Sequence, residues 1–269
     1  MPSPSRKPSA SGRPASADVP SRRSNSGASD DGLRPGDSAV GIWTLIVGIA
    51  ISGFLFWKNH ETAMWFEEYY LLNILMLLWP PSLLILLVLR RELSDFGFTI
   101  GDLKRGVIAA VIGFLLFTPV LLVVSRTPDA QRYYLGALLG NRPYGSGAIQ
   151  GLIMTTTGYI GGTLDYGRLV FHEAVLGFYM FAWEWFFRGF LLNGLRRTFP
   201  LWLSIAIQAG LFCWLHVGKP LPEVCSSLAG GVVLGIVAVR FRSFLPCFLV
   251  HALISMGFDF AVLYFHFHP

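Results

Sequence analysis

Long apolar stretches constrain this chain more than any other feature of its sequence. A bilayer core of about 30 Å needs an apolar helix of about 20 residues, because an α-helix rises about 1.5 Å per residue. Stretches of roughly this length, separated by polar connections, occupy residues 39–57, 69–90, 106–125, 169–195, 200–216, 224–239 and 245–265. Hydrophobic residues make up 53% of the chain and charged residues 14%, against roughly 25% charged in a soluble domain. The sequence therefore predicts an all-α, polytopic transmembrane helical bundle of about seven to eight spans, the eighth being a re-entrant segment at 149–160.

Basic residues indicate how the spans are oriented. Cytoplasmic loops are enriched in Lys and Arg, and with seven spans the clusters of basic residues fall on the side of the N-terminus. We therefore expect a cytoplasmic N-terminus. The net charge of +5 follows from this distribution and gives no case for nucleic acid as a partner. Residues 1–37 are rich in Ser, Pro and Gly and are expected to form a disordered basic tail, whereas residues 38–268 form the transmembrane domain.

A pair of opposite charges inside the fourth span is the first candidate site. Glu184 and Arg188 are four residues apart, so they share a face of a helix and can touch. A charged side chain in hydrocarbon costs at least a few kcal/mol, which makes the pair a hypothesis for a functional site. Along straight helices, Glu184 lies about 20 Å from the cytoplasmic end, His216 about 24 Å and His251 about 12 Å. A common site for the three therefore requires tilted helices.

Three interpretations fit a carboxylate and two imidazoles in a dry cavity. Glu184 can act as general base on a water molecule while the imidazoles orient it or stabilise an oxyanion. The two His and one Glu can instead hold zinc with one position open for water. The third interpretation is a buried polar network that holds helices together. His172 and Glu173 begin another zinc pattern, His-Glu-x-x-His, but Leu176 stands where the second His is required.

The segments EWFFRG at 184–189 and FCWLH at 212–216, followed by His251 in the last span, occur on separate predicted helices. In this order they resemble the three motifs of the CPBP family of intramembrane proteases, which includes the CAAX prenyl endopeptidases and the Abi bacteriocin self-immunity proteins. The family's pattern is Glu-Glu-x-x-x-Arg, Phe-x-x-x-His and His-x-x-x-Asn. The resemblance covers about residues 92–265.

Two residues depart from the family's pattern. Trp183 stands where the family has the Glu that is usually assigned as general base, and Ser255 stands where it has Asn. Ser255 can still donate a hydrogen bond to an oxyanion, whereas Trp183 cannot accept a proton. Either Glu184 takes the base role, or another carboxylate supplies it, or hydrolysis has been lost. Two auxiliary carboxylates come into question: Glu223 near the exterior mouth, and Asp259 on the face of the last helix that carries the third motif.

The resemblance implies an intramembrane endopeptidase that hydrolyses membrane-associated or prenylated peptides. We expect Glu184 to act as base with His216 as its partner for water, His251 and Ser255 on the oxyanion side, and Arg188 orienting Glu184. The expected partners are the lipid bilayer and a membrane-embedded or lipidated peptide, and the expected location is the plasma membrane of a bacterium. No cofactor is expected; the alternative is zinc held by Glu184, His216 and His251.

The alternative function is a catalytically inactive membrane scaffold, or a bacteriocin-immunity-type protein, that retains the family's fold. The two functions predict different structures. An enzyme needs the carboxylate of Glu184 and both imidazoles around one water-sized space. Glu184 packed against Arg188 alone, with both imidazoles elsewhere, would favour the scaffold.

Overall fold

The computed structural model describes residues 37–61, 64, 66–138 and 166–268, all within one compact unit, Arg34–Pro269. The expected tail, apart from Asp37, and the segment 149–160 lie outside the described residues. No β-strand occurs in the described part of the chain. The helices are α1 (Asp37–Glu61), α2 (Phe66–Leu83), η1 (Leu84–Val88), η2 (Leu93–Phe96), α3 (Leu103–Val124), α4 (Pro128–Leu138), α5 (Tyr166–Glu184), η3 (Trp185–Leu191), α6 (Leu192–Leu195), α7 (Leu201–Trp214), α8 (Leu221–Phe241) and α9 (Leu245–Phe267).

The all-α polytopic bundle predicted from the sequence is confirmed. Five of the described helices are long and apolar enough to cross a membrane, namely Ser38–His60, Glu68–Val88, Leu103–Val124, Leu221–Phe241 and Leu245–Phe267. The protein is therefore an integral membrane protein. The predicted fourth and fifth spans are helical but are not among the five. The fourth carries several ionisable residues, and α7, with 14 residues, rises only about 21 Å.

Proline residues explain the irregular end of the second span. Pro80 and Pro81 lie inside α2 and have no backbone N–H to donate, so the regular hydrogen-bond ladder is interrupted. The chain continues as a π-helix, η1, in which the N–H of Leu89 donates to the carbonyl of Leu84 at 2.9 Å. The interruption at these prolines is followed by a widened helical turn.

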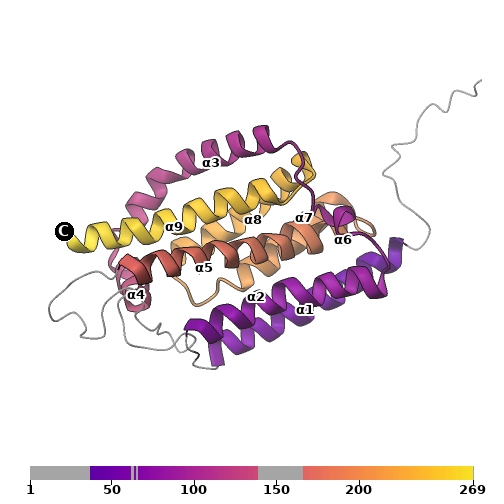
Figure 1. Cartoon of the computed structure of the whole chain (residues 1–269), viewed down its shortest axis with the longest axis horizontal. Coiled ribbons are helices and arrows are strands. Elements are labelled where there is room, and N and C mark those ends of the chain that lie inside the picture. The colour runs from indigo at the N-terminus through magenta and orange to yellow at the C-terminus, as the bar shows by residue number, and fades with distance from the viewer. Residues whose placement is uncertain (1–36, 62–63, 65, 139–165, 269) are drawn as a thin grey trace, which may run out of the picture. The chain divides into compact units, whose positions relative to one another are not determined.

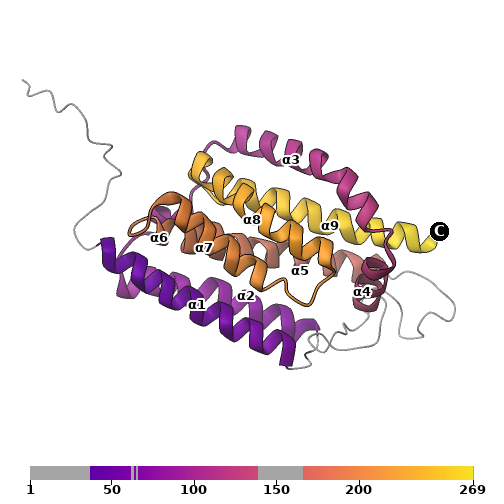
Figure 2. The ribbon, with the colours of Figure 1, turned by 180° about the vertical axis from the view of Figure 1, so that it is seen from behind.

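The helices pack so that the charged pair lies at the centre of the bundle. Figures 1 and 2 show α1 and α2 side by side at one edge and α3 beside α9 at the other, with α5 and α7 between them. Helix α5 contacts both α2 and α9, and it continues through η3 into α6 without a break. Every residue of η3, from Trp185 to Leu191, is buried. The segment that carries Arg188 is therefore the core of the fold.

Candidate active site

Glu184 and Arg188 form an ion pair that is sealed from solvent. Arg188 Nη1 donates to Glu184 Oε1 at 2.9 Å, and both side chains are 0% exposed. The guanidinium carbon of Arg188 also lies 4.1 Å from the centre of the Phe212 ring, a distance at which a cation is attracted by an aromatic face. Two partners from different helices thus hold the guanidinium in place.

His251 binds the same carboxylate oxygen from α9. Its Nδ1 lies 2.6 Å from Glu184 Oε1, although Glu184 and His251 are 67 residues apart. Since a carboxylate only accepts hydrogen bonds, the proton of this contact is on Nδ1. In the neutral imidazole, Nε2 then keeps a free lone pair. Glu184 therefore fixes both the tautomer and the direction of the His251 ring.

His216 is held in a similar way by a backbone group. Its Nδ1 lies 2.8 Å from the carbonyl oxygen of Phe212, which can only accept, so Nδ1 is the donor here as well. The Phe212 ring centre is 4.6 Å from that of His216 and 5.8 Å from that of His251. The ring of Trp183 meets His216 edge-on at 5.8 Å. His216 and His251 are thus two oriented imidazoles on either side of one aromatic ring.

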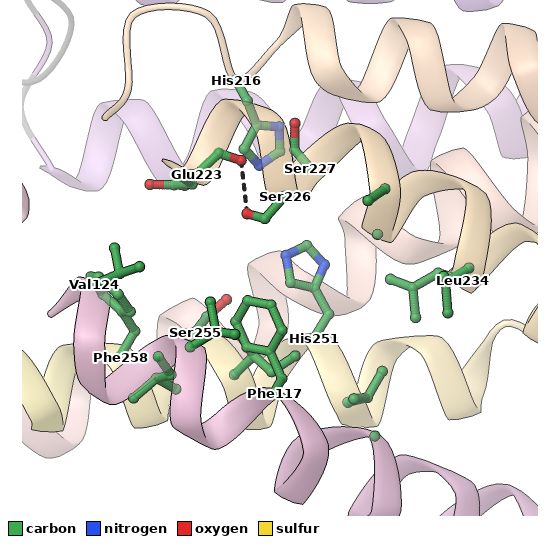
Figure 3. A pocket seen from close by; sticks show the side chains of 18 of the residues that line it. Phe117, Val124, His216, Glu223, Ser226, Ser227, Leu234, His251, Ser255 and Phe258 are labelled. Atoms are coloured by element: carbon green, nitrogen blue, oxygen red, sulfur yellow. Dashed lines mark hydrogen bonds between the residues drawn. The ribbon is translucent and has the colours of Figure 1, made fainter. Parts of the chain in front are cut away.

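The two imidazoles line one pocket of about 420 Å³, a size typical of small-molecule and peptide sites. In Figure 3, His216 and His251 point into it from opposite walls, with Ser226 and Ser255 nearby. Most of the remaining lining is apolar and comes from α3, α8 and α9. Glu184 is not among the described residues that line the pocket. It contacts the pocket through His251.

One comparison with known proteins covers most of the residues of this site. Residues 168–257 match a family model described as type II CAAX prenyl endopeptidase, Rce1-like. This segment is similar to that family. The resemblance predicted from the three motifs is thereby confirmed, and the match covers Glu184, Arg188, His216 and His251. The comparisons with curated proteins and with solved structures gave no match.

Glu223 lines the same pocket, and both of its carboxylate oxygens are engaged. One accepts a hydrogen bond from Lys219 Nζ at 2.5 Å and the other from the Tyr134 hydroxyl on α4. Burial lowers the pKa of Lys219, but the carboxylate of Glu223 together with Tyr133 and Tyr69 outweighs burial, and the pKa lies above its ordinary value. Lys219 therefore stays charged and fixes Glu223, which in turn anchors α4 beside the pocket.

Asp259 does not line the pocket, although it lies on the same helix as His251 and Ser255, which do. A helix turns by about 100° per residue, so eight residues after His251 the direction has drifted by about 80°. Asp259 instead pairs with His172 of α5, whose Nε2 lies 3.1 Å from Asp259 Oδ2. The auxiliary roles of Glu223 and Asp259 stay predictions, with Glu223 at the pocket and Asp259 away from it.

Zinc at Glu184, His216 and His251 requires donor atoms of all three within reach of one ion. Among the described residues, the group of His, Cys, Asp and Glu side chains that meets this condition is His172, Glu173 and Asp259. Glu184, His216 and His251 are not such a group among the described residues. Zinc held by these three residues stays a prediction.

Two features of the site were not expected from the sequence. Helix α4 supplies Tyr134 to the pocket, although it lies in a connection between two predicted spans. The signal for it was Pro128, which starts the helix. The second feature is that Phe212, the first residue of its motif, contacts Arg188, His216 and His251. The motif includes Phe212, but its spacing does not predict that the Phe212 ring contacts three of the site residues.

Proposed function

We propose that this protein is an intramembrane endopeptidase that cleaves membrane-embedded or prenylated peptides with a water molecule activated by His251. One observation carries the proposal: His251 lines the pocket while its Nδ1 is 2.6 Å from the buried carboxylate of Glu184. The family match to CAAX prenyl endopeptidases supports the reaction class. The role assigned to Glu184 differs from the expectation that it acts on water directly, because Glu184 does not line the pocket.

Proton transfer follows from the tautomer of His251. Its Nε2 lone pair accepts a proton from water as the water oxygen attacks the peptide carbonyl carbon. The ring becomes an imidazolium, which the carboxylate of Glu184 stabilises through the Nδ1–H bond. The same Nε2–H then delivers the proton to the departing amine as the C–N bond breaks. A positioned acid and base of this kind contributes typically about 10²–10⁴-fold to the rate.

His216 and Ser255 act on the attacking water and on the developing oxyanion in the pocket. His216 donates Nδ1–H to the Phe212 carbonyl, so its Nε2 accepts a hydrogen bond and holds the attacking water. The Ser255 hydroxyl makes a weak hydrogen bond to the Met180 sulfur at 3.5 Å. It can exchange that sulfur for a developing oxyanion, a stronger acceptor. Arg188 holds the carboxylate of Glu184 in place through its hydrogen bond to Oε1.

The surroundings of the site suit a lipid-associated substrate. The pocket is largely apolar, and the helices around it are long enough to cross a bilayer. A peptide can therefore reach His251 with an apolar or prenylated portion against α3 and α8. The mechanism needs no metal or other cofactor. By the distribution of basic residues, we propose a cytoplasmic N-terminus in a bacterial plasma membrane.

Cleavage of a fluorogenic peptide by protein in liposomes tests the proposal. The substrate is a short CAAX-type peptide, compared with and without a farnesyl group on its Cys. We expect His251→Gln and Glu184→Gln to lower kcat by at least about 100-fold, since each removes part of the general base. His268→Gln, which changes an exposed imidazole just after the end of the same helix, is the control and retains activity. Unchanged cleavage by His251→Gln would refute the proton-transfer role.

A second function, an inactive scaffold, is favoured by Trp183. Its side chain is 5% exposed, it fills the position of the family's first Glu, and its ring packs against Phe187 and Phe212. The same liposomes separate the two functions. A scaffold binds the farnesylated peptide, measured by fluorescence anisotropy, and leaves its mass unchanged after prolonged incubation. The enzyme releases two fragments.

A further inference from the structure

A second group of ionisable side chains lies outside the pocket, between α5 and α9. It consists of His172 and Glu173 on α5 and Asp259 on α9, which are 4%, 9% and 6% exposed. One donor atom from each lies within 4.8 Å of those of the other two. The group is about three turns of α5 away from Glu184, roughly 16 Å along the axis. It is therefore separate from the proposed catalytic residues.

The surroundings of the Glu173 carboxylate indicate that a ligand binds it. Both of its carboxylate oxygens are buried, and neither has a hydrogen-bond partner among the described residues. The second carboxylate, Asp259, lies beside it and bonds to His172 at 3.1 Å. A buried, unbonded carboxylate next to another carboxylate is strongly unfavourable unless a proton or a cation compensates the charge. A divalent cation neutralises two carboxylates and gives each an oxygen–metal bond.

We propose that His172, Glu173 and Asp259 bind one Zn²⁺ or Mn²⁺ ion that links α5 to α9. The donor set excludes preferential binding of Ca²⁺ or Mg²⁺, which take oxygen ligands, because one of the three donors is an imidazole nitrogen. Zinc–ligand bonds are about 2.0–2.2 Å long, so donors that share an ion lie at most about 4.3 Å apart. The donor atoms of the three side chains lie within 4.8 Å of one another. To bind one ion together, they must therefore move about half an ångström closer.

The position of the His172 ring agrees with this role. The Tyr70 ring meets it edge-on at 6.3 Å, and Tyr70 is itself buried. The ring is thus held between α2 and α9, with Nε2 directed towards Asp259. Packing of this kind restricts the rotation of the ring and so favours one direction of its Nε2 atom. The ion would link α5 to α9, and α2 contacts the same stretch of α5 through Tyr70.

Metal content and metal titration of the detergent-purified full chain test the proposal. After chelator treatment and dialysis, ZnCl₂ or MnCl₂ is added, and binding is followed by calorimetry, elemental analysis and the thermal unfolding midpoint. We expect one ion per chain with a raised midpoint. Glu173→Gln and Asp259→Asn should each weaken binding at least about tenfold, and both keep the side-chain shape. Asp129→Asn, an exposed carboxylate on α4, should bind as the wild type does.

His216→Gln distinguishes the new site from the catalytic pocket. It should leave binding stoichiometry and affinity unchanged, because His216 is not part of the group. Loss of binding in His216→Gln with retention in Glu173→Gln would place the ion in the pocket and overturn the proposal. Wild-type protein that binds neither ion and shows no shift in its unfolding midpoint would overturn it without any variant, and would mean that a proton compensates Glu173.

Discussion

Removal of the buried charge of Arg188 gives the most direct test of how this core is held together. Arg188 Nη1 lies 2.9 Å from Glu184 Oε1, with both side chains 0% exposed. At an effective dielectric constant of about 20, two unit charges at that distance attract by about 6 kcal/mol. Moving each ion out of water costs several kcal/mol. The pair as a whole therefore contributes little, whereas either charge alone is strongly destabilising.

This balance predicts a double-mutant cycle. Arg188→Met leaves Glu184 buried without its cation and also removes the contact with Phe212, so the free energy of unfolding should fall by about 3–5 kcal/mol. Glu184→Gln should cost about as much, because it leaves the guanidinium unpaired. The double variant carries no buried charge at this position. Its loss should be smaller than the sum of the two single losses by at least about 2 kcal/mol.

Reversible unfolding in mixed micelles of SDS and a mild detergent measures these free energies. The exposed pair Arg105 and Asp102, with an N–O distance of 3.4 Å, provides a control cycle. Its coupling should be at most about 1 kcal/mol, since solvent screens an exposed ion pair. Additive losses in the buried cycle, within about 0.5 kcal/mol, would refute the argument that each charge is stabilised by the other.

Three further predictions concern the packing and the charge around the site. Gly194→Ala places a Cβ 2.2 Å from Thr44 Oγ1 and 2.8 Å from Thr44 Cβ and should cost about 1–3 kcal/mol in the same assay. Adding Thr44→Ala removes Oγ1 but keeps the Cβ, so it should restore only part of this loss. Gly210→Ala, where nothing lies within 4 Å, should cost nothing. Asn193→Leu removes a side chain that donates to three backbone carbonyls around η3, so stability should fall by about 1–3 kcal/mol. Burial raises the pKa of Tyr133 from 10.0 to about 12. The neutral Tyr133 therefore contributes fully to the free energy of unfolding below pH 10. Between pH 10 and 12 this free energy should fall by about 2–3 kcal/mol, and Tyr133→Phe should abolish the fall.

The sequence predicted the spans well because their signal is local. An apolar run of about 20 residues is sufficient evidence for a membrane helix whatever its neighbours are. The spans at 39–57, 106–125 and 245–265 each correspond to a described helix that is long enough to cross a bilayer. Helix α4 was not predicted, because 11 residues of mixed polarity give no such run. Its position depends on Tyr134 reaching Glu223, which is a tertiary contact.

The site residues were predicted by type and order, but their geometry was not. Straight helices placed Glu184 about 8 Å deeper than His251, whereas the two side chains are in contact at 2.6 Å. The π-helical segment η3, with seven residues, accounts for part of this difference, because it has wider turns than an α-helix and advances less along its axis. Positions inferred from motif spacing are those of a regular helix. They therefore do not predict that His251 lines the pocket while Glu184 contacts His251 from outside it.

Charge balance explains why Trp183 and the Glu184–His251 contact occur together. Glu184 and Arg188 cancel each other, so with a neutral His251 the buried site carries no net charge. A second carboxylate at position 183 would add a negative charge beside His216, and a buried charge without a partner is costly. Trp183 avoids that cost and leaves one carboxylate to support proton transfer. The proposed reaction respects the same balance, because the imidazolium of His251 forms only while negative charge develops on the substrate oxygen in the pocket beside it.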